Sequence, residues 1–240
     1  MRYKKNYDVE LVQPGFANGI SLQLAEKFQA HQMNSGIHLT DSEREIIITN
    51  AAKAFGEFLD ALGVDWKNDP NSADTPRRVA KAYMEKWAGR FEPLPEITAF
   101  PSDGYDGLVV QSNIPLVSMC SHHHEEIRGY VTVAYIPTKN GKVVGLSKLN
   151  RIVEHFGRRG QIQEQLTVAI HNAIRIICEG NQGVAVVVDA THSCVSCRGV
   201  KHQGTSMQTT KLSGCFLKED SARAEFMMHV SDAVRKRNLN

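Results

Sequence analysis

The chain has 240 residues, of which 42% are hydrophobic and 22% charged, values that are ordinary for a globular protein with its own core. Its 28 basic and 26 acidic side chains leave a net charge of +2, which is too balanced to predict a nucleic-acid-binding protein. The sequence has no apolar run of about eighteen residues and no apolar segment near its N-terminus, so neither a transmembrane helix nor a secretory signal is expected. Five cysteines, an odd number, favour a reducing cytoplasm over a disulfide framework.

The N-terminal part of the chain divides into an arm and a helical region. Residues 1–39 show no sustained hydrophobic period, and we expect an arm that is mobile or packs on a partner, with a short helix around 21–32. Thr40 to Glu43 reads as a capping box that opens a helix, and Gly63 is a natural stop. Pro76 stands where a second helix would begin, and that helix should end at Gly89. These signals predict an N-terminal helical region over residues 40–106.

The hydrophobic period changes to two from residue 108 onwards. Extended segments are predicted over 108–120 and 130–136, and Asn140-Gly141 predicts a hairpin into 142–145. The pattern then predicts two helices, a buried strand, a last strand and a final helix, over 147–158, 161–178, 183–191, 211–217 and 222–237. Helices followed by strand pairs and a helix pair indicate an α+β fold, with a second domain over 107–240.

Two short motifs concentrate metal-binding side chains. Cys120-Ser121-His122-His123 and His192-Ser193-Cys194 together supply two thiols and three imidazoles, a mixture that suits zinc. A site with three protein ligands leaves a position for water, which favours catalysis over a purely structural role. Cys120 and His123 form a C-x-x-H clamp, which leaves His122 as a candidate for proton transfer. The alternative is a solvent-facing histidine cluster beside an unrelated buried cysteine.

The second motif lies at the end of the predicted strand 183–191. If the strand continues, His192, Cys194 and Arg198 face the same side. Cys194 and Cys197 also form a C-x-x-C pair, which is found in redox sites and in closed zinc sites. A redox C-x-x-C normally opens a helix, and on a regular strand these two thiols would point to opposite faces, so both alternatives are disfavoured.

Cationic residues cluster where the first of the two paired helices begins. Ser147, Lys148 and Arg151 follow Gly145 at a predicted helix N-terminus, an arrangement that favours anion binding. Arg158 and Arg159 are better explained as an ordinary solvated helix face. Glu164, in the first turn of the second helix, is either a purine-edge acceptor or a favourable first-turn acid.

Taken together, these motifs resemble the GTP cyclohydrolase I family. The resemblance runs from about Asp41 to Val230 in order, and includes Thr75 to Lys81, Val133 to Pro137, Val144 to Val153 and Gln161 to Thr167. It implies a T-fold (tunnelling fold) domain, with an antiparallel sheet and two helices preceded by N-terminal helices. It further implies a homo-oligomer, a toroidal decamer, with active sites at subunit boundaries and no nucleic-acid or membrane partner.

The resemblance also implies a role for each site residue. Zinc would be bound by Cys120, His123 and Cys194 and would activate a water that attacks C8 of GTP, while His122 and His192 move protons. Formate release, ribose rearrangement and ring closure would give 7,8-dihydroneopterin triphosphate, the first step toward pterins and tetrahydrofolate or 7-deazaguanines. Glu164, with Gln163 beside it, would hold the guanine edge. The ribose and triphosphate would be held by Ser147, Lys148, Arg151, Arg198 and Arg78, some of them from neighbouring subunits.

The chain departs from the family pattern at two places. The family usually has Glu where this chain has Ser121, and His124-Glu125-Glu126 replaces a segment that is usually more apolar. The loss of an acid beside the metal leaves two other hypotheses open. One is a family member that binds nucleotide without turnover, and the other is a related T-fold enzyme that acts on a pterin or a deazaguanine.

Overall fold

The computed structural model describes residues 33, 36–237 and 239, and the chain folds as two compact units. Among the described residues, the first unit covers 39–84, and the second covers 33 and 36–38 with 85–237 and 239. The expected arm, with its helix around 21–32, lies almost entirely outside the described residues. None of the helices in the described part of the chain combines the length and hydrophobicity that membrane crossing requires.

The first unit begins with the helix that the capping box predicted. The hydroxyl of Thr40 accepts a hydrogen bond from the backbone N–H of Glu43 (3.3 Å), and the Glu43 carboxylate accepts one from the backbone N–H of Thr40 (2.8 Å). These reciprocal bonds satisfy two N–H groups that a helix start leaves unpaired. Helix α2 (Asp41–Ala61) follows, and Gly63 adopts a left-handed conformation beyond its end. Helix α3 (Thr75–Lys86) starts with Pro76 in its first turn, as predicted.

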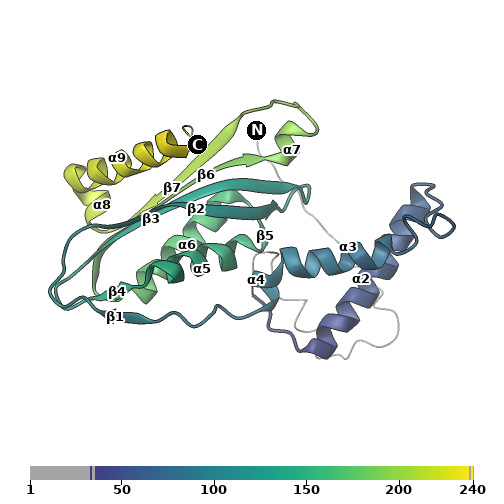
Figure 1. Cartoon of the computed structure of the whole chain (residues 1–240), viewed down its shortest axis with the longest axis horizontal. Helices are drawn as coiled ribbons and strands as arrows, with labels where there is room; N and C mark the ends of the chain where they lie inside the picture. The colour runs from purple at the N-terminus through teal and green to yellow at the C-terminus, as the bar shows by residue number, and fades with distance from the viewer. Residues whose placement is uncertain (1–32, 34–35, 238, 240) are drawn as a thin grey trace, which may run out of the picture. The chain divides into compact units, whose positions relative to one another are not determined.

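The second unit is built on a five-stranded sheet in the order β5-β2-β3-β6-β7 (Figure 1). Its three long central strands pair antiparallel, and only the two-residue β5 lies parallel to its neighbour. The strands are β2 (Val109–Cys120), β3 (Glu126–Pro137), β5 (Gly160–Gln161), β6 (Asn181–His192) and β7 (Ser206–Leu212). The segment predicted over 108–120 is one strand, which a bulge between Gln111 and Ile114 interrupts.

Helices cover both faces of this sheet (Figure 1). Helices α5 (Leu146–Gly157) and α6 (Gln163–Ile177) pack on one face, where Ile152 and Ile170 join inward-facing residues such as Val186 in the larger core. Helices α8 (Cys215–Lys218) and α9 (Asp220–Arg237) bury Phe216 and Phe226 against the other face. The sheet with its two helices, after N-terminal helices, confirms the predicted α+β class.

The predicted hairpin at Asn140-Gly141 is wrong. Strand β4 (Lys142–Val144) pairs with β1 (Ala99–Pro101) in a separate two-stranded sheet. Both edges of β3 are already paired, one with β2 and the other with β6, so β3 has no edge left for β4. The backbone N–H of Val144 donates instead to the hydroxyl of Tyr135 on β3 (2.9 Å).

Three further boundaries differ from the predictions. Strand β6 ends at His192 and runs into the one-turn helix α7 (Ser193–Ser196). The last strand lies at 206–212 instead of 211–217, because Gly214 adopts a left-handed conformation and α8 begins directly after it. The helix predicted to end at Gly89 ends at Lys86, and Gly89 lies within the next short helix, α4 (Ala88–Phe91).

Candidate metal and nucleotide site

Two strand ends and one helical turn bring three potential metal ligands together. Cys120 is the last residue of β2, His192 is the last residue of β6, and Cys194 lies in α7. One ligand atom from each of these residues lies within 4.8 Å of the other two. Cys120 is buried at 4% exposure, whereas His192 and Cys194 are partly exposed. Solvent therefore reaches the group through His192 and Cys194.

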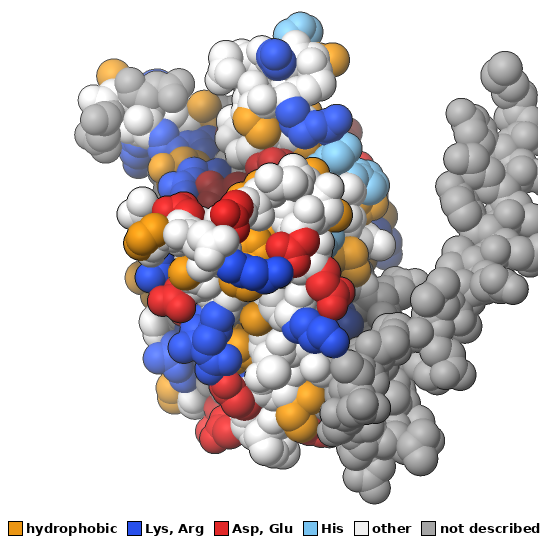
Figure 2. Space-filling view, turned by 90° about the vertical axis from the view of Figure 1, so that its right-hand side faces the viewer, with side chains coloured by type: hydrophobic (Ala, Val, Ile, Leu, Met, Phe, Trp, Pro, Cys, Tyr) orange, Lys and Arg blue, Asp and Glu red, His pale blue; other side chains and the backbone are white. Residues whose placement is uncertain are grey.

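A tight turn between β2 and β3 presents the histidine cluster. The backbone N–H of His124 donates to the carbonyl of Cys120 (2.9 Å), and the N–H of Cys120 donates to the carbonyl of Glu125 (2.8 Å). His122, His123 and His124 are all exposed on this turn. Figure 2 shows several exposed His side chains close together, with Lys and Arg side chains nearby, and another His apart from them at the top of the view. The turn thus offers imidazoles to solvent beside the buried thiol.

The structure groups His192, and not His123, with the two thiols among the described residues. The ring of His123 lies instead against that of His122, with centroids 6.4 Å apart. The predicted single-face arrangement of His192, Cys194 and Arg198 on a continuing strand is wrong, because the strand ends at His192 and a helical turn carries Cys194 toward Cys120. Cys197 is exposed and does not belong to the group.

Burial disfavours the charged forms of Cys194 and His192. Burial and the neighbouring Cys120 raise the pKa of the Cys194 thiol, while Arg198 acts in the opposite direction. Burial also lowers the pKa of His192, against the opposing effect of the Glu164 carboxylate. Two close thiols and a neutral imidazole are soft or borderline donors that zinc accepts readily, and zinc binding would deprotonate the thiols. The donor set therefore fits zinc.

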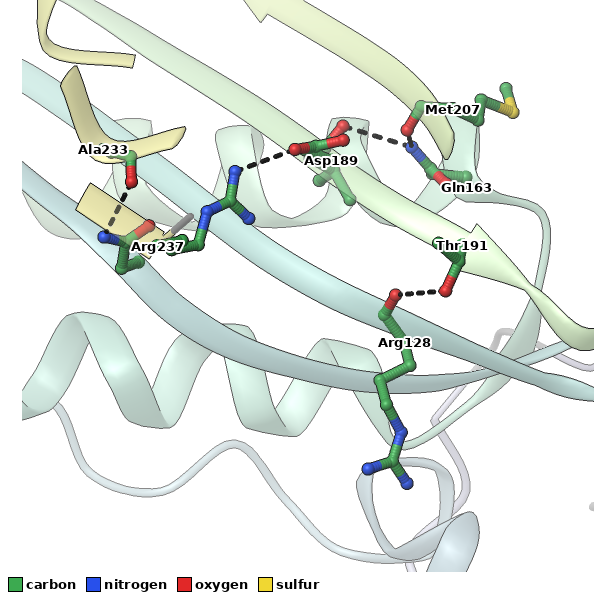
Figure 3. A network of polar contacts seen from close by, with 9 residues as sticks. Arg128, Gln163, Asp189, Thr191, Met207, Ala233 and Arg237 are labelled. Carbon is green, nitrogen blue, oxygen red and sulfur yellow. Dashed lines mark hydrogen bonds and ion pairs between the residues drawn. The ribbon is translucent and has the colours of Figure 1, made fainter. Parts of the chain in front are cut away.

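Gln163 is a buried residue that contacts His192 of the metal group. Gln163 is 1% exposed, and its amide Nε2 donates to the carbonyl of Met207 on β7 (2.8 Å; Figure 3). The same nitrogen donates to the carbonyl of Val188 on the neighbouring β6 (3.2 Å). The ring Nε2 of His192 lies 2.8 Å from the amide Oε1 of Gln163. The next residue, Glu164, is exposed. Of the pair that was predicted to hold guanine, only Glu164 is open to a ligand.

The predicted phosphate-binding residues lie in three separate places. Arg198 is exposed and close enough to Cys194 to affect its pKa. The first turns of α5 carry Ser147, Lys148 and Arg151. This helix begins near Tyr135, which pairs with Val109. Val109 is the first residue of β2, at the opposite end of the strand from Cys120. A strand as long as β2 spans roughly 35 Å. Arg78 belongs to the first unit, where it pairs with Asp74 (3.4 Å).

Several polar residues that support the site were not predicted from the sequence. The backbone of Gln161 pairs with Cys120 and accepts a hydrogen bond from the N–H of Ser121 (3.2 Å), which brings the start of α6 to the metal group. The hydroxyls of Thr167 and Thr209 bond to each other behind Gln163. The sequence did contain a signal that Gln163 and Thr167 are buried. They are four residues apart and lie on the helix face that carries Ile170 and Ile174.

Comparison with known proteins decides the family. The family model described as GTP cyclohydrolase I matches residues 51–231. The chain belongs to the GTP cyclohydrolase I family. It is 42% identical over 174 residues to GTP cyclohydrolase 1 of Shewanella sp. (strain ANA-3), with 71% of this chain and 79% of that protein covered. It is 39% identical over 215 residues to GTP cyclohydrolase 1 of Shewanella amazonensis (strain ATCC BAA-1098 / SB2B), with 85% and 96% covered.

Membership in the GTP cyclohydrolase I family confirms the resemblance and the enzyme class drawn from the sequence motifs. The matched range contains every residue of the candidate site, from Arg78 to Arg198. Among solved structures, the archaeosine synthase QueF-Like in its apo form matches 45% of this chain and 93% of its own, at 20% identity and a TM-score of 0.36. That likeness is too distant to bear on the site.

Proposed function

We propose that this chain is a zinc-dependent enzyme that converts GTP and water to 7,8-dihydroneopterin triphosphate and formate. The observation that carries the proposal is the meeting of Cys120, His192 and Cys194 in a chain of the GTP cyclohydrolase I family. The reaction would be the first step toward pterins and tetrahydrofolate, or toward 7-deazaguanines. Five cysteines without a disulfide are consistent with a cytoplasmic enzyme.

Zinc would be held by Cys120 and Cys194, with His123 as the third ligand, as the resemblance implies. Bound there, zinc would lower the pKa of a water molecule toward neutrality and so make it a nucleophile at C8 of guanine. His192 is the competing third ligand, since its ring lies within 4.8 Å of both sulfurs. Zinc content of the His123 and His192 variants separates the two assignments.

The remaining residues would bind the substrate and move protons. His122 is exposed on the turn next to Cys120, where it can donate a proton to the imidazole nitrogen of the guanine. His192 is neutral near pH 7, because burial lowers its pKa, and it can therefore accept a proton. The Glu164 carboxylate can accept hydrogen bonds from the N–H groups of the guanine edge, and Arg198 can pair with a phosphate.

A complete site would require more than one copy of the chain. The predicted triphosphate ligands Ser147, Lys148 and Arg151 lie toward the opposite end of the sheet from Cys120. In the described part of the chain, β7 has a partner on one side only, and β2 is covered on its outer side only by the two residues of β5. Open edges of this kind pair readily with another chain. Both features support a homo-oligomer, and we propose a decamer with active sites at its subunit boundaries.

One incubation tests this function. Purified, zinc-loaded protein is given GTP, and formate release and product mass are recorded with and without a chelator. We expect formate and 7,8-dihydroneopterin triphosphate in equal amounts, loss of both on chelation, and recovery on adding zinc. Unchanged GTP with zinc-loaded protein would overturn the proposal, and nucleotide binding without turnover would favour the non-catalytic alternative that Ser121 suggests. A panel of pterins and deazaguanines tests the third alternative.

A further inference from the structure

The amide of Gln163 is held in one orientation. Its Nε2 lies within hydrogen-bonding distance of the carbonyl oxygens of Val188 and Met207 and of the hydroxyl of Thr209 (3.2 Å). A carbonyl oxygen can only accept, so the group that faces both carbonyls must be the amide NH₂. The opposite orientation would place the amide oxygen against two backbone oxygens at 1% exposure, a costly arrangement. Figure 3 shows the Gln163 amide held between these two strands.

This orientation determines which nitrogen of His192 carries the proton. With the NH₂ group on the carbonyls, the Oε1 of Gln163 faces the ring Nε2 of His192 at 2.8 Å. An amide oxygen has no hydrogen to donate, so the Nε2–H of His192 must donate to it. A neutral imidazole carries one proton, and Nδ1 therefore keeps its lone pair.

The support extends one layer further. The hydroxyl of Thr167 donates to the backbone carbonyl of Gln163 (2.8 Å), and Thr167 is itself 2% exposed. Thr209 on β7 contacts both the Thr167 hydroxyl and the Gln163 amide. The amide is thus tied to α6, β6 and β7 at once. Its position is set by the core of the unit and does not need a ligand.

We propose that Gln163 is a positioning residue that holds the ring of His192 in one orientation and in the Nε2–H tautomer, so that Nδ1 is the basic nitrogen offered to the site. The catalytic consequence rests on the proposed function, because it matters only if His192 accepts a proton there. Gln163 then acts through His192 and does not touch guanine. The adjacent Glu164 is exposed and keeps the role of guanine ligand.

Four variants separate positioning from guanine binding. Gln163→Leu removes the acceptor. Gln163→Glu, protonated at this buried position, keeps a carbonyl acceptor for the His192 ring and an O–H donor toward the backbone carbonyls within a similar volume. Glu164→Gln removes the proposed guanine ligand. Gln165→Leu makes the same change as Gln163→Leu at an exposed position two residues along the helix and serves as the matched control. Thermal unfolding of all four variants checks that they fold.

Two measurements on these variants use GTP. The affinity for GTP is measured by calorimetry on zinc-depleted protein, where no turnover occurs, and kcat and KM are measured on zinc-loaded protein. For Gln163→Leu we expect kcat to fall about 10- to 100-fold, the usual range for a residue that orients a site histidine, with GTP affinity within about threefold of the original. Gln163→Glu should recover part of the rate, Glu164→Gln should lose affinity, and Gln165→Leu should change neither.

A third measurement needs no turnover. Nitrogen NMR of protein labelled with ¹⁵N-histidine reads the protonation of each ring nitrogen, and subtraction of the spectrum of His192→Gln assigns the His192 signals. We expect a protonated Nε2 and a bare Nδ1 in the unaltered protein, and a mixture of tautomers in Gln163→Leu.

Three outcomes would overturn the proposal. They are a proton on Nδ1 in the unaltered protein, a Gln163→Leu variant with weaker GTP binding at normal kcat, and a Gln163→Leu variant with no change in rate or tautomer. If the unaltered protein fails to convert GTP, the proposed function fails separately, and the NMR result still decides whether Gln163 sets the tautomer.

Discussion

The two sides of the candidate site are held very differently. On the outer side, His122 and His123 are exposed on a short turn. Backbone hydrogen bonds between Cys120 and residues 124 and 125 close this turn. On the inner side, Gln163 is buried and tied to three elements, and it holds His192 beside the two thiols. A group that must keep its geometry through a reaction gains from a packed environment, whereas a group that meets substrate must be reachable. The inner side is thus packed within the chain, and the histidines of the outer side are exposed.

Loss of an inner-side thiol should have the largest effect. Cys194→Ser replaces a soft ligand with a hydroxyl that binds zinc weakly, so we expect zinc to be lost and GTP turnover to fall by about 10⁴-fold or more. Metal analysis of the purified protein and formate release measure the two effects. Cys197→Ser, at the exposed cysteine three residues on, is the matched control and should keep both.

The outer-side histidines should differ from each other. His122→Ala should retain zinc and lose about 10³-fold in kcat, because it removes a proton donor and leaves the metal ligands in place. His123→Ala should lose zinc as well as activity, and His192→Ala should keep zinc. The test is to measure the zinc content and the rate of GTP turnover of all three variants. Zinc lost from His192→Ala but kept in His123→Ala would move the third ligand to the inner side.

His155, a buried histidine outside the site, should make the stability of the fold depend on pH. Burial, followed by the charges of Arg159 and His38, lowers the pKa of His155 to about 4, and the Nη2 of Arg159 donates to its Nε2 (2.8 Å). Between pH 6.5 and 4 the unfolded chain binds a proton at this residue that the folded chain does not. The free energy of unfolding should therefore fall as the pH drops through this window, by about 3 kcal/mol in total.

Denaturant unfolding between pH 7 and pH 4 measures this loss. His155→Gln cannot titrate, and it should show a flatter dependence on pH over the same window. Equal slopes in the variant and the unaltered protein would show that His155 does not cause the loss.

Loss of the exposed acid beside the inner side should have a moderate effect. In the proposed complex Glu164 would accept two charge-assisted hydrogen bonds from the guanine edge. Glu164→Gln would replace them with weaker ones, and we expect kcat/KM for GTP to fall about 10- to 100-fold. The effect should appear mainly in KM and in the affinity of zinc-free protein for GTP. A fall in kcat with unchanged affinity would instead indicate that Glu164 acts through the charge it exerts on His192.

The smallest effect is expected at Ser121. The family resemblance leads us to expect Glu at this position, and Ser121→Glu would place a carboxylate next to Cys120. We expect a change of less than about tenfold in kcat with zinc retained, because the substitution alters the charge around the ligands and leaves the ligands themselves unchanged. The measurement is kcat for GTP as a function of pH, for the unaltered protein and for Ser121→Glu. A gain of several hundredfold would show that the outer side of the unaltered chain lacks an acid it needs.

Local sequence determined much of this protein by itself. The capping box of α2, the helical period of α5 and α6 and the alternation in β3 involve neighbours within a few residues, and each of these elements formed as predicted. The motifs with Cys120 and Cys194 indicated a metal site, and together with the motifs over 75–81, 133–137, 144–153 and 161–167 they indicated the family, which the family model confirms. The structure brings the two thiols together.

Tertiary structure alone decided the rest. The partner of β4 depends on which strand edges are already taken, and a turn signal does not report that. The nearness of His192 to the thiols depends on β6 ending at that residue, opposite Ile127 near the start of β3, while β2 ends at Cys120 on the other side of β3. The burial of Gln163 depends on β6 and β7 offering carbonyls at its position. In each case the deciding contact joins residues far apart in the chain, and its energy becomes available only when the sheet has assembled.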